Sequence, residues 1–279
     1  MFKKLTAISL VASACLFTNV YAENTLEEAF ANGKVKGEVR AYFNQEKQDD
    51  SKSSSITHYG GFLSYETADI NGLSVGGIFQ VSSVADINGA NRFSGDEDAS
   101  GAVLSEAYLA YTRDNTSLKI GRQFIGTPLV AGSGSRMIRQ SFQGYTLTNT
   151  DLPQTKIIAL YVDRFQGRTN GKGNPGEFTK TFNTNVNGGS FGAYERVLND
   201  GAYSLYAQNK SISNLTITGQ YVDAVDVFST MYLDSLYNFK TMNELYVKGQ
   251  YIGTNYDTSE ASGDFFAVRV GAKYKNFNF

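Results

Sequence analysis

Segments in which apolar and polar residues alternate recur between residues 33 and 274 of the chain. One of them, residues 215–221, reads LTITGQY. Because successive side chains of a β-strand point to opposite faces, this period of two predicts strands with one apolar and one polar face. We expect twelve such strands, at residues 33–45, 56–68, 72–84, 102–113, 117–125, 141–150, 154–165, 200–210, 214–224, 227–239, 243–254 and 263–275.

The connections between the expected strands alternate between short and long. The short ones carry turn residues and lie at residues 69–72, 114–116, 151–154, 211–214, 240–243 and 275–276. The long, mostly polar ones lie at residues 46–55, 86–101, 126–140, 166–199 and 254–263, and the short connection at 223–226 is an exception. Short turns at one rim and long loops at the other are typical of a transmembrane barrel.

Alternation alone would also fit a water-soluble sandwich, so the strand lengths and the asymmetric connections matter. A strand of about 9–11 residues is long enough to cross a bilayer. A closed barrel satisfies every backbone hydrogen bond in lipid without a helix. We therefore predict an all-β fold, an antiparallel transmembrane β-barrel of about twelve strands, with the start of a further strand at residues 277–279.

The first 32 residues follow a different pattern. Residues 1–22 have the features of a cleaved export signal: Lys3 and Lys4 precede an apolar stretch, and Ala22 offers a small residue for cleavage. A lipoprotein signal that uses Cys15 is the alternative. Residues 23–32 predict a short helix that begins with a capping box of Thr25 and Glu28, and residues 33–279 would form the barrel.

Composition narrows the possible partners and chemistry. Cys15 is the only cysteine, so the chain cannot form an internal disulfide or a cysteine-ligated metal site. The chain has 25 basic and 27 acidic residues, and this balance argues against nucleic acid as a partner. We expect no cofactor, no metal and no catalytic residue. The expected partners are outer-membrane lipid, lipopolysaccharide and small polar or carboxylate solutes, with the protein a monomer or a trimer.

Two motif matches and one histidine suggest enzyme chemistry without supporting it. Residues 171–176 match a dinucleotide-binding fingerprint, but they lie in a long polar loop instead of between a strand and a helix. Residues 188–192 match a nucleophile elbow, but the only histidine, His58, comes earlier in the chain. A barrel-embedded hydrolase with His58 as its base is a remaining alternative, and it would need a serine or an acid beside that histidine.

The alternation directs many charged side chains to the interior. A charge on the lipid face would cost about 2–4 kcal/mol at mid-depth. The predicted pore-lining basic residues are Lys36, Arg40, Lys119, Lys248, Arg269 and Lys273. The predicted pore-lining acidic residues are Glu38, Glu66, Glu106 and Asp234. Such charges can select ions by sign, or they can simply pair with one another, and the pattern leaves both possibilities open.

The third long loop, residues 126–140, is apolar at its start and rich in glycine, and it carries Arg136 and Arg139 without an acid. Folded into the barrel, it would narrow the pore and place two guanidinium groups that can hold carboxylates. The alternative is a well-packed outer loop. The acidic residues Asp96, Glu97 and Asp98 lie in the second long loop, where we expect a solvated segment or, alternatively, a site that attracts divalent cations.

Several of these segments together resemble the OprD-type outer-membrane porins. The resemblance is carried by GRQF at 121–124, TPL at 127–129, RMI at 136–138, SFQGY at 141–145 and DLP at 151–153. Residues 25–40 are also similar to the start of the variants found in epsilon-class bacteria. The resemblance implies an 18-stranded, substrate-selective porin for small, often carboxylate-bearing nutrients, in which the third loop narrows the channel and basic side chains line the wall.

By that resemblance, Arg136, Arg139 and Arg122 belong to the pore constriction, and Lys36, Arg40, Arg269 and Lys273 are candidates for the basic wall. Against the 18 strands that the resemblance implies, twelve would leave six missing at the C-terminal end, so we expect an incomplete barrel. Arg122 shares its parity with Leu118 and Ile120, which would direct it to lipid, and we therefore expect a bulge or the start of a loop near Gly121.

We interpret the chain as a non-enzymatic porin in the outer membrane of a Gram-negative bacterium. It would allow passive diffusion of small polar solutes, with a preference for anions or carboxylates. A barrel for surface adhesion or binding is the first alternative, and the hydrolase is the second.

Overall fold

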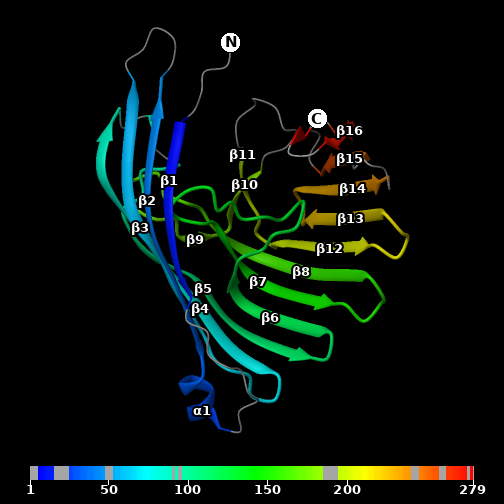
Figure 1. Cartoon of the computed structure of the whole chain (residues 1–279), viewed down its shortest axis with the longest axis horizontal. Helices are drawn as coiled ribbons and strands as arrows, with labels where there is room; N and C mark the ends of the chain where they lie inside the picture. The colour runs from blue at the N-terminus through cyan, green and yellow to red at the C-terminus, as the bar shows by residue number, and fades with distance from the viewer. Residues whose placement is uncertain are drawn as a thin grey trace.

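The computed structural model describes residues 6–15, 25–47, 53–89, 92–93, 96–184, 194–239, 245–257, 262–274 and 277–278. One antiparallel sheet dominates it, and the strands of this sheet follow one another in chain order and curve as the wall of a barrel (Figure 1). They are β1 Thr6–Cys15, β2 Lys34–Glu46, β3 Ser54–Glu66, β4 Leu73–Asn88, β5 Gly101–Arg113, β6 Thr116–Gln123, β7 Ser141–Asn149, β8 Thr155–Gln166, β12 Ala202–Asn209, β13 Leu215–Ala224, β14 Phe228–Asn238, β15 Tyr246–Tyr256 and β16 Gly263–Gly271.

Smaller pieces complete the strands. The short β9 (Phe178–Thr179) pairs with β8, β10 (Thr181–Thr184) pairs with β11 (Tyr194–Val197), and β17 (Lys273–Tyr274) pairs with β18 (Phe277–Asn278). Among the described strands, no pairing joins β16 to β1 or β2, so the described wall is open. In the described part of the chain, no helix has the length and apolar character that crossing a membrane requires.

The predicted all-β, antiparallel architecture is confirmed. Each of the twelve expected strands corresponds to one strand of the wall, from β2 to β16, with ends that differ by a few residues. The short turns contain residues with left-handed backbone angles, such as Asn71 (φ 51°) and Asn214 (φ 65°), a conformation that asparagine tolerates better than most residues do.

The short N-terminal helix is also confirmed, as α1 (Leu26–Ala31). The hydroxyl of Thr25 accepts a hydrogen bond from the Glu28 backbone N–H, and the Glu28 carboxylate accepts one from the Thr25 N–H, both at 3.2 Å. The Ala68 N–H donates to the Ala29 carbonyl at 2.9 Å, which holds the helix against the short turn after β3. The helix therefore marks the rim with the short turns.

The export signal stays a prediction. In the structure, residues 6–15 of that segment form β1, paired with residues 36–45 of β2. An apolar, weakly alternating segment can extend the sheet at an open edge, and cleavage after residue 22 would free the edge of β2. Of the further strand expected at residues 277–279, the structure describes β18, and Phe279 lies outside the described residues.

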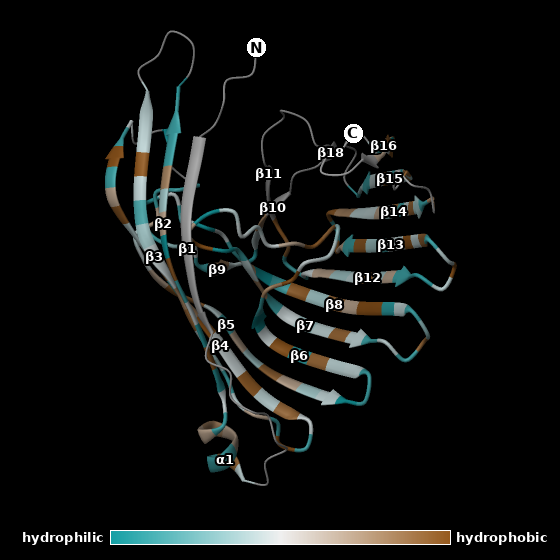
Figure 2. Ribbon diagram, viewed as in Figure 1, coloured by the Kyte–Doolittle hydropathy of each residue, from teal (hydrophilic) through white to brown (hydrophobic). Residues whose placement is uncertain are grey.

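The wall has an apolar outer face and a mixed inner face, as the alternation predicts. In β12, Tyr203 and Leu205 are 56% and 57% exposed, whereas Ser204 and Tyr206 on the other side are buried. The same alternation of apolar and polar bands appears along most strands of the wall in Figure 2. An exposed apolar face of this extent suits lipid and not water.

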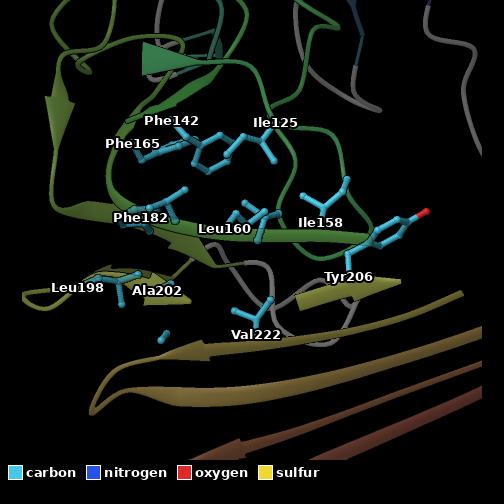
Figure 3. Close-up of a cluster of buried hydrophobic side chains, with 13 residues drawn as sticks. Ile125, Phe142, Ile158, Leu160, Phe165, Phe182, Leu198, Ala202, Tyr206 and Val222 are labelled. Carbon is cyan, nitrogen blue, oxygen red and sulfur yellow. The ribbon is translucent and has the colours of Figure 1, made fainter. Parts of the chain in front are cut away.

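Part of the inner face is more apolar than we expected. A cluster of buried side chains lies on β8, β12 and β13, and includes Leu160, Val162 and Val222. Figure 3 shows Ile125, Phe142 and Phe165 gathered beside Leu160 of β8. Val130 of the third long loop belongs to the same cluster, so that loop covers this part of the inner wall.

Of the two features expected near Gly121, the bulge is absent, whereas β6 does end two residues later, at Gln123. The pairing of β6 with β5 and with β7 runs without a register shift through Gly121 and Arg122. Gly121 instead has φ 120°, and a Cβ atom there would lie 2.3 Å from the Ala107 carbonyl oxygen. The glycine thus allows close contact between the strands, and Arg122 keeps its outward parity.

Candidate functional site

Loop 3, which we define as residues 126–140 between β6 and β7, is fixed to the inner wall near its start. The backbone N–H of Thr127 donates to the Val130 carbonyl at 2.9 Å and closes a tight turn. Gln220, on the inner face of β13, accepts from the Leu129 N–H at 2.9 Å and donates to the Thr127 hydroxyl at 2.8 Å. Because the Gln220 side chain is only 3% exposed, these hydrogen bonds are shielded from water.

The far end of loop 3 is fixed in the same manner to β4. The side-chain oxygen of Gln80 accepts from the Arg139 N–H at 2.9 Å, and its nitrogen donates to the Arg139 carbonyl at 3.0 Å. The same nitrogen donates to the Ser105 hydroxyl at 2.5 Å. Between β4 and β13 the sheet contains β5, β6, β7, β8 and β12, so loop 3 crosses the concave side of the wall.

Arg136 of loop 3 is neutralised by acids of loop 2, the connection between β4 and β5. Its Nε lies 3.0 Å from a Glu97 carboxylate oxygen and 3.2 Å from one of Asp96. Its side chain is 24% exposed, and Arg40 of β2 donates to its carbonyl at 3.0 Å. The guanidinium therefore already has carboxylate partners from the protein itself.

The environment of this pair changes the proton affinity of both partners. Burial raises the pKa of the Glu97 carboxyl, although Arg136 and a hydrogen bond from Asn44 oppose the shift. For Arg136, desolvation acts to lower the pKa, but the carboxylates of Glu97 and Asp96 outweigh it and raise the pKa. The expectation that the acidic cluster is a solvated segment is wrong for Glu97, which is 6% exposed.

Loop 4, the connection between β8 and β12, joins the same network. Arg168 donates from Nη1 to the Asp96 carboxylate and from Nη2 to the Ser133 hydroxyl, the latter at 2.7 Å. Asp96 is thus shared by the guanidinium groups of Arg136 and Arg168. Ion pairs and hydrogen bonds therefore connect loops 2, 3 and 4 at the rim with the long loops.

Arg139 differs from Arg136 in its surroundings. Its guanidinium lies over the ring of Phe124, 4.0 Å from the centroid, and the residue is exposed. The described residues provide no ion pair for it. Such stacking leaves the N–H groups at the edge of the guanidinium able to bind an anion.

The inner wall beside Arg139 contains a second cation without an ion pair in the described part of the chain. Lys119 of β6 places its Nζ 3.7 Å from the centroid of the Tyr108 ring. Glu106, which accepts a hydrogen bond from the Phe124 N–H at 2.7 Å, lies within electrostatic range of both Lys119 and Arg139. Glu66 acts on the same groups, so two cations and two acids share this part of the wall, and of the two cations Arg139 is the one in loop 3.

The remaining pore-lining predictions divide into paired and unpaired residues. Arg40 lies 2.5 Å from Glu38, and Lys248 lies 2.8 Å from Asp234, so these four charges satisfy one another. Exposed charged residues for which the described part of the chain shows no ion pair are Lys36, Glu66 and Arg269. The side chain of Lys273 lies outside the described residues.

The structure does not bring Arg122 to the other two arginines of the predicted constriction. Its guanidinium lies 4.4 Å from the centroid of the Phe178 ring, and Nη1 donates to the Leu104 carbonyl at 3.4 Å. Arg122 shares its parity on β6 with Ile120, which is 37% exposed on the outer face. Its assignment to the constriction is therefore corrected: Arg122 faces away from the interior.

His58 does lie beside a serine, as the hydrolase alternative requires, but both residues are buried. Its Nδ1 is 3.4 Å from the Ser82 hydroxyl, and each residue is only 2% exposed. His58 and Ser82 line a small cavity, and Met137 and Ile138 of loop 3 line it from the other side. A substrate has no access to this serine in the described arrangement.

Comparison with known proteins agrees with this architecture. The family model described as outer membrane porin, OprD family, matches residues 105–265. Comparison with curated proteins found no match. Acinetobacter baumannii OccAB2 has a similar structure, with a TM-score of 0.73, 19% identity, and coverage of 90% of this chain and 65% of that one.

Two Pseudomonas aeruginosa structures are also similar. OpdO has a TM-score of 0.70 at 13% identity, covering 89% of this chain and 63% of that one. OpdK with vanillate has a TM-score of 0.65 at 15% identity, covering 87% and 63%. The chain thus spans less than two thirds of the length of these three proteins, and at these identities the likeness shows the fold. The family match over residues 105–265 covers more than half of the chain, and it shows that the chain belongs to the OprD family of porins and is a Gram-negative outer-membrane protein.

Proposed function

We propose that the protein is a passive diffusion channel for small polar solutes, with a preference for anions and carboxylates. The observation that carries this proposal is the position of loop 3, which crosses the inner side of the wall and exposes the unpaired guanidinium of Arg139. A fixed cation in a narrow passage with low-dielectric walls attracts anions and repels cations.

Of the two arginines of loop 3, Arg139 would make the main electrostatic contribution, because Arg136 is already paired with Glu97 and Asp96. Arg136 would instead hold loop 3 in position. The guanidinium of Arg139 could bind a carboxylate through two parallel hydrogen bonds. The similar protein OpdK was determined with vanillate, and we extend a preference for small carboxylates of that kind to this chain.

The test is the reversal potential of the purified protein in a planar bilayer under a potassium chloride gradient. We expect a channel that prefers chloride, and an Arg139→Gln variant in which the chloride-to-potassium permeability ratio falls roughly twofold to tenfold, as expected for one unit charge near the permeating ion. Arg113→Gln is the control, because Arg113 is on the outward face near a short turn and 80% exposed. An unchanged ratio in Arg139→Gln would reject the role of this residue, and a wild-type protein without conductance would favour the adhesion alternative.

A further inference from the structure

A row of polar side chains crosses three neighbouring strands on the outward face of the wall. Arg122 of β6 lies opposite Gln143 of β7, which lies opposite Arg164 of β8. The pairing of β7 with β8 shifts by one residue between Gln143 and Gly144. Asp163 therefore has no cross-strand partner on β7, and Arg164 pairs with Gln143. The three residues share the outward parity of Ile120 and Tyr145, which are 37% and 51% exposed.

Directly next to this row is a row of aromatic residues. Tyr145, Tyr161 and Tyr203 are cross-strand partners on β7, β8 and β12. The ring centroids of Tyr145 and Tyr161 are 6.1 Å apart, and those of Tyr161 and Tyr203 are 4.8 Å apart. Outward-facing tyrosines of this kind form the girdle of a transmembrane barrel at the membrane interface.

The row of Arg122, Gln143 and Arg164 lies on the long-loop side of that girdle. Two residues of strand separate the rows, which corresponds to about 7 Å. The long loops face the outside in this architecture. The polar row is therefore at the level of the lipid headgroups of the outer leaflet, just beyond its hydrocarbon.

The two guanidinium groups of this row have no ion pair among the described residues. Arg164 is exposed, and Arg122 is held in place by the Phe178 ring and the Leu104 carbonyl. Two strand spacings separate β6 from β8, about 9–10 Å, which the long arginine side chains can partly close. A cation on the lipid-facing side is costly unless an anion neutralises it.

We propose that Arg122, Gln143 and Arg164 form a docking site for the phosphate groups of lipid A, the anionic lipid portion of lipopolysaccharide. Arginine binds phosphate through two parallel charge-assisted hydrogen bonds, and the Gln143 amide can donate a further one between the two guanidinium groups. The site is on the opposite face from loop 3, so it does not depend on the proposed transport function.

The test measures the retention of lipid A by the full chain in detergent micelles, with native mass spectrometry as the readout. The probes are diphosphorylated lipid A and its fully dephosphorylated form. We expect the wild-type protein to retain the diphosphorylated lipid, and Arg122→Gln/Arg164→Gln to retain it about tenfold more weakly, with no such difference for the dephosphorylated lipid. Arg113→Gln, on the same face at the opposite rim, should behave as wild type.

Two further variants keep the test decisive if the double glutamine variant folds poorly. Arg122→Lys/Arg164→Lys keeps both charges and should retain more lipid than the glutamine pair, whereas Asp163→Asn removes the nearest acid along the chain and should increase retention. Equal retention of the diphosphorylated lipid by the wild type and the glutamine pair would overturn the proposal. Binding of inorganic phosphate without retention of lipid A would overturn the assignment to a lipid.

Discussion

The two arginines of loop 3 have different roles because their neighbours differ. Arg136 contacts Glu97 and Asp96, whereas Arg139 stacks on Phe124 and has no ion pair in the part of the chain that the structure describes. A guanidinium that is already neutralised adds little to the potential in the passage. At the scale of single residues, anion preference therefore depends on Arg139 more than on Arg136.

The anion preference also depends on pH, because Glu97 can take up a proton next to Arg136. Burial raises the pKa of its carboxyl, so the folded protein takes up this proton at a higher pH than the unfolded chain does. The resulting stabilisation is fully present below the ordinary pKa of glutamate and is lost as the pH rises through the raised pKa. Protonation also removes a negative charge next to Arg136, which increases the positive potential around loop 3.

We therefore predict that the anion preference increases as the pH falls from neutral towards the ordinary titration range of glutamate. In Glu97→Gln, where the charge is absent at every pH, the higher preference should already appear at neutral pH and change less on acidification. The reversal potential in a bilayer at several pH values measures both effects. A Glu97→Gln variant with the pH profile of the wild type would show that other groups cause the dependence.

At the scale of elements, loop 3 is a fixed part of the wall because two glutamines hold its ends. Gln80 binds the backbone N–H and carbonyl of Arg139, and Gln220 binds Leu129 and Thr127. Amide side chains can donate and accept at once, so each one satisfies two polar groups of the loop. Gly60 has a different role, since a Cβ atom there would lie 2.1 Å from the Val81 carbonyl oxygen, and the glycine thus allows close contact between β3 and β4.

We predict that Gln80→Leu loosens loop 3 without unfolding the wall. The change leaves the backbone groups of Arg139 without their partner, which costs about 1–3 kcal/mol for a buried group. The loop then opens locally at a lower cost in free energy, and trypsin cleaves the opened loop. Cleavage after Arg136 and Arg139 should therefore become roughly five- to hundredfold faster.

Gln208→Leu provides the matched control. Gln208 is on β12 and donates to the Thr218 hydroxyl at 3.3 Å, without contact to loop 3. Its substitution should leave the cleavage of loop 3 unchanged. Equal cleavage rates in Gln80→Leu and the wild type would mean that the hydrogen bonds of Gln80 do not hold the loop.

The strands could be predicted from the sequence, whereas the contacts of the loops could not. Alternation is a local property, and it identified the strands and the inward parity of Gln220. The ion pair of Arg136 with Glu97 joins residues far apart in the chain, and no spacing rule predicts such a contact. The polar residues Gln80, Gln220 and Arg168 carry no motif that indicates a partner.

At the scale of the whole molecule, the distribution of polarity is the reverse of that in a soluble protein. Leu205 and other large apolar side chains cover the outside, while charged and amide side chains lie inside. The buried apolar cluster on β8, β12 and β13 is an exception that the alternation missed. It has a physical reason, since the apolar start of loop 3 covers the wall there and excludes water.

The most direct test of this account is the accessibility of introduced cysteines in a conducting channel. Cys15 is the only native cysteine, so single-cysteine variants can be made in a Cys15→Ser background. We predict that a water-soluble, membrane-impermeant thiol reagent reduces the current through Arg139→Cys and leaves the current through Leu205→Cys unchanged. A current that does not change in Arg139→Cys, or that falls equally in Leu205→Cys, would contradict the position of loop 3 inside a wall that faces lipid.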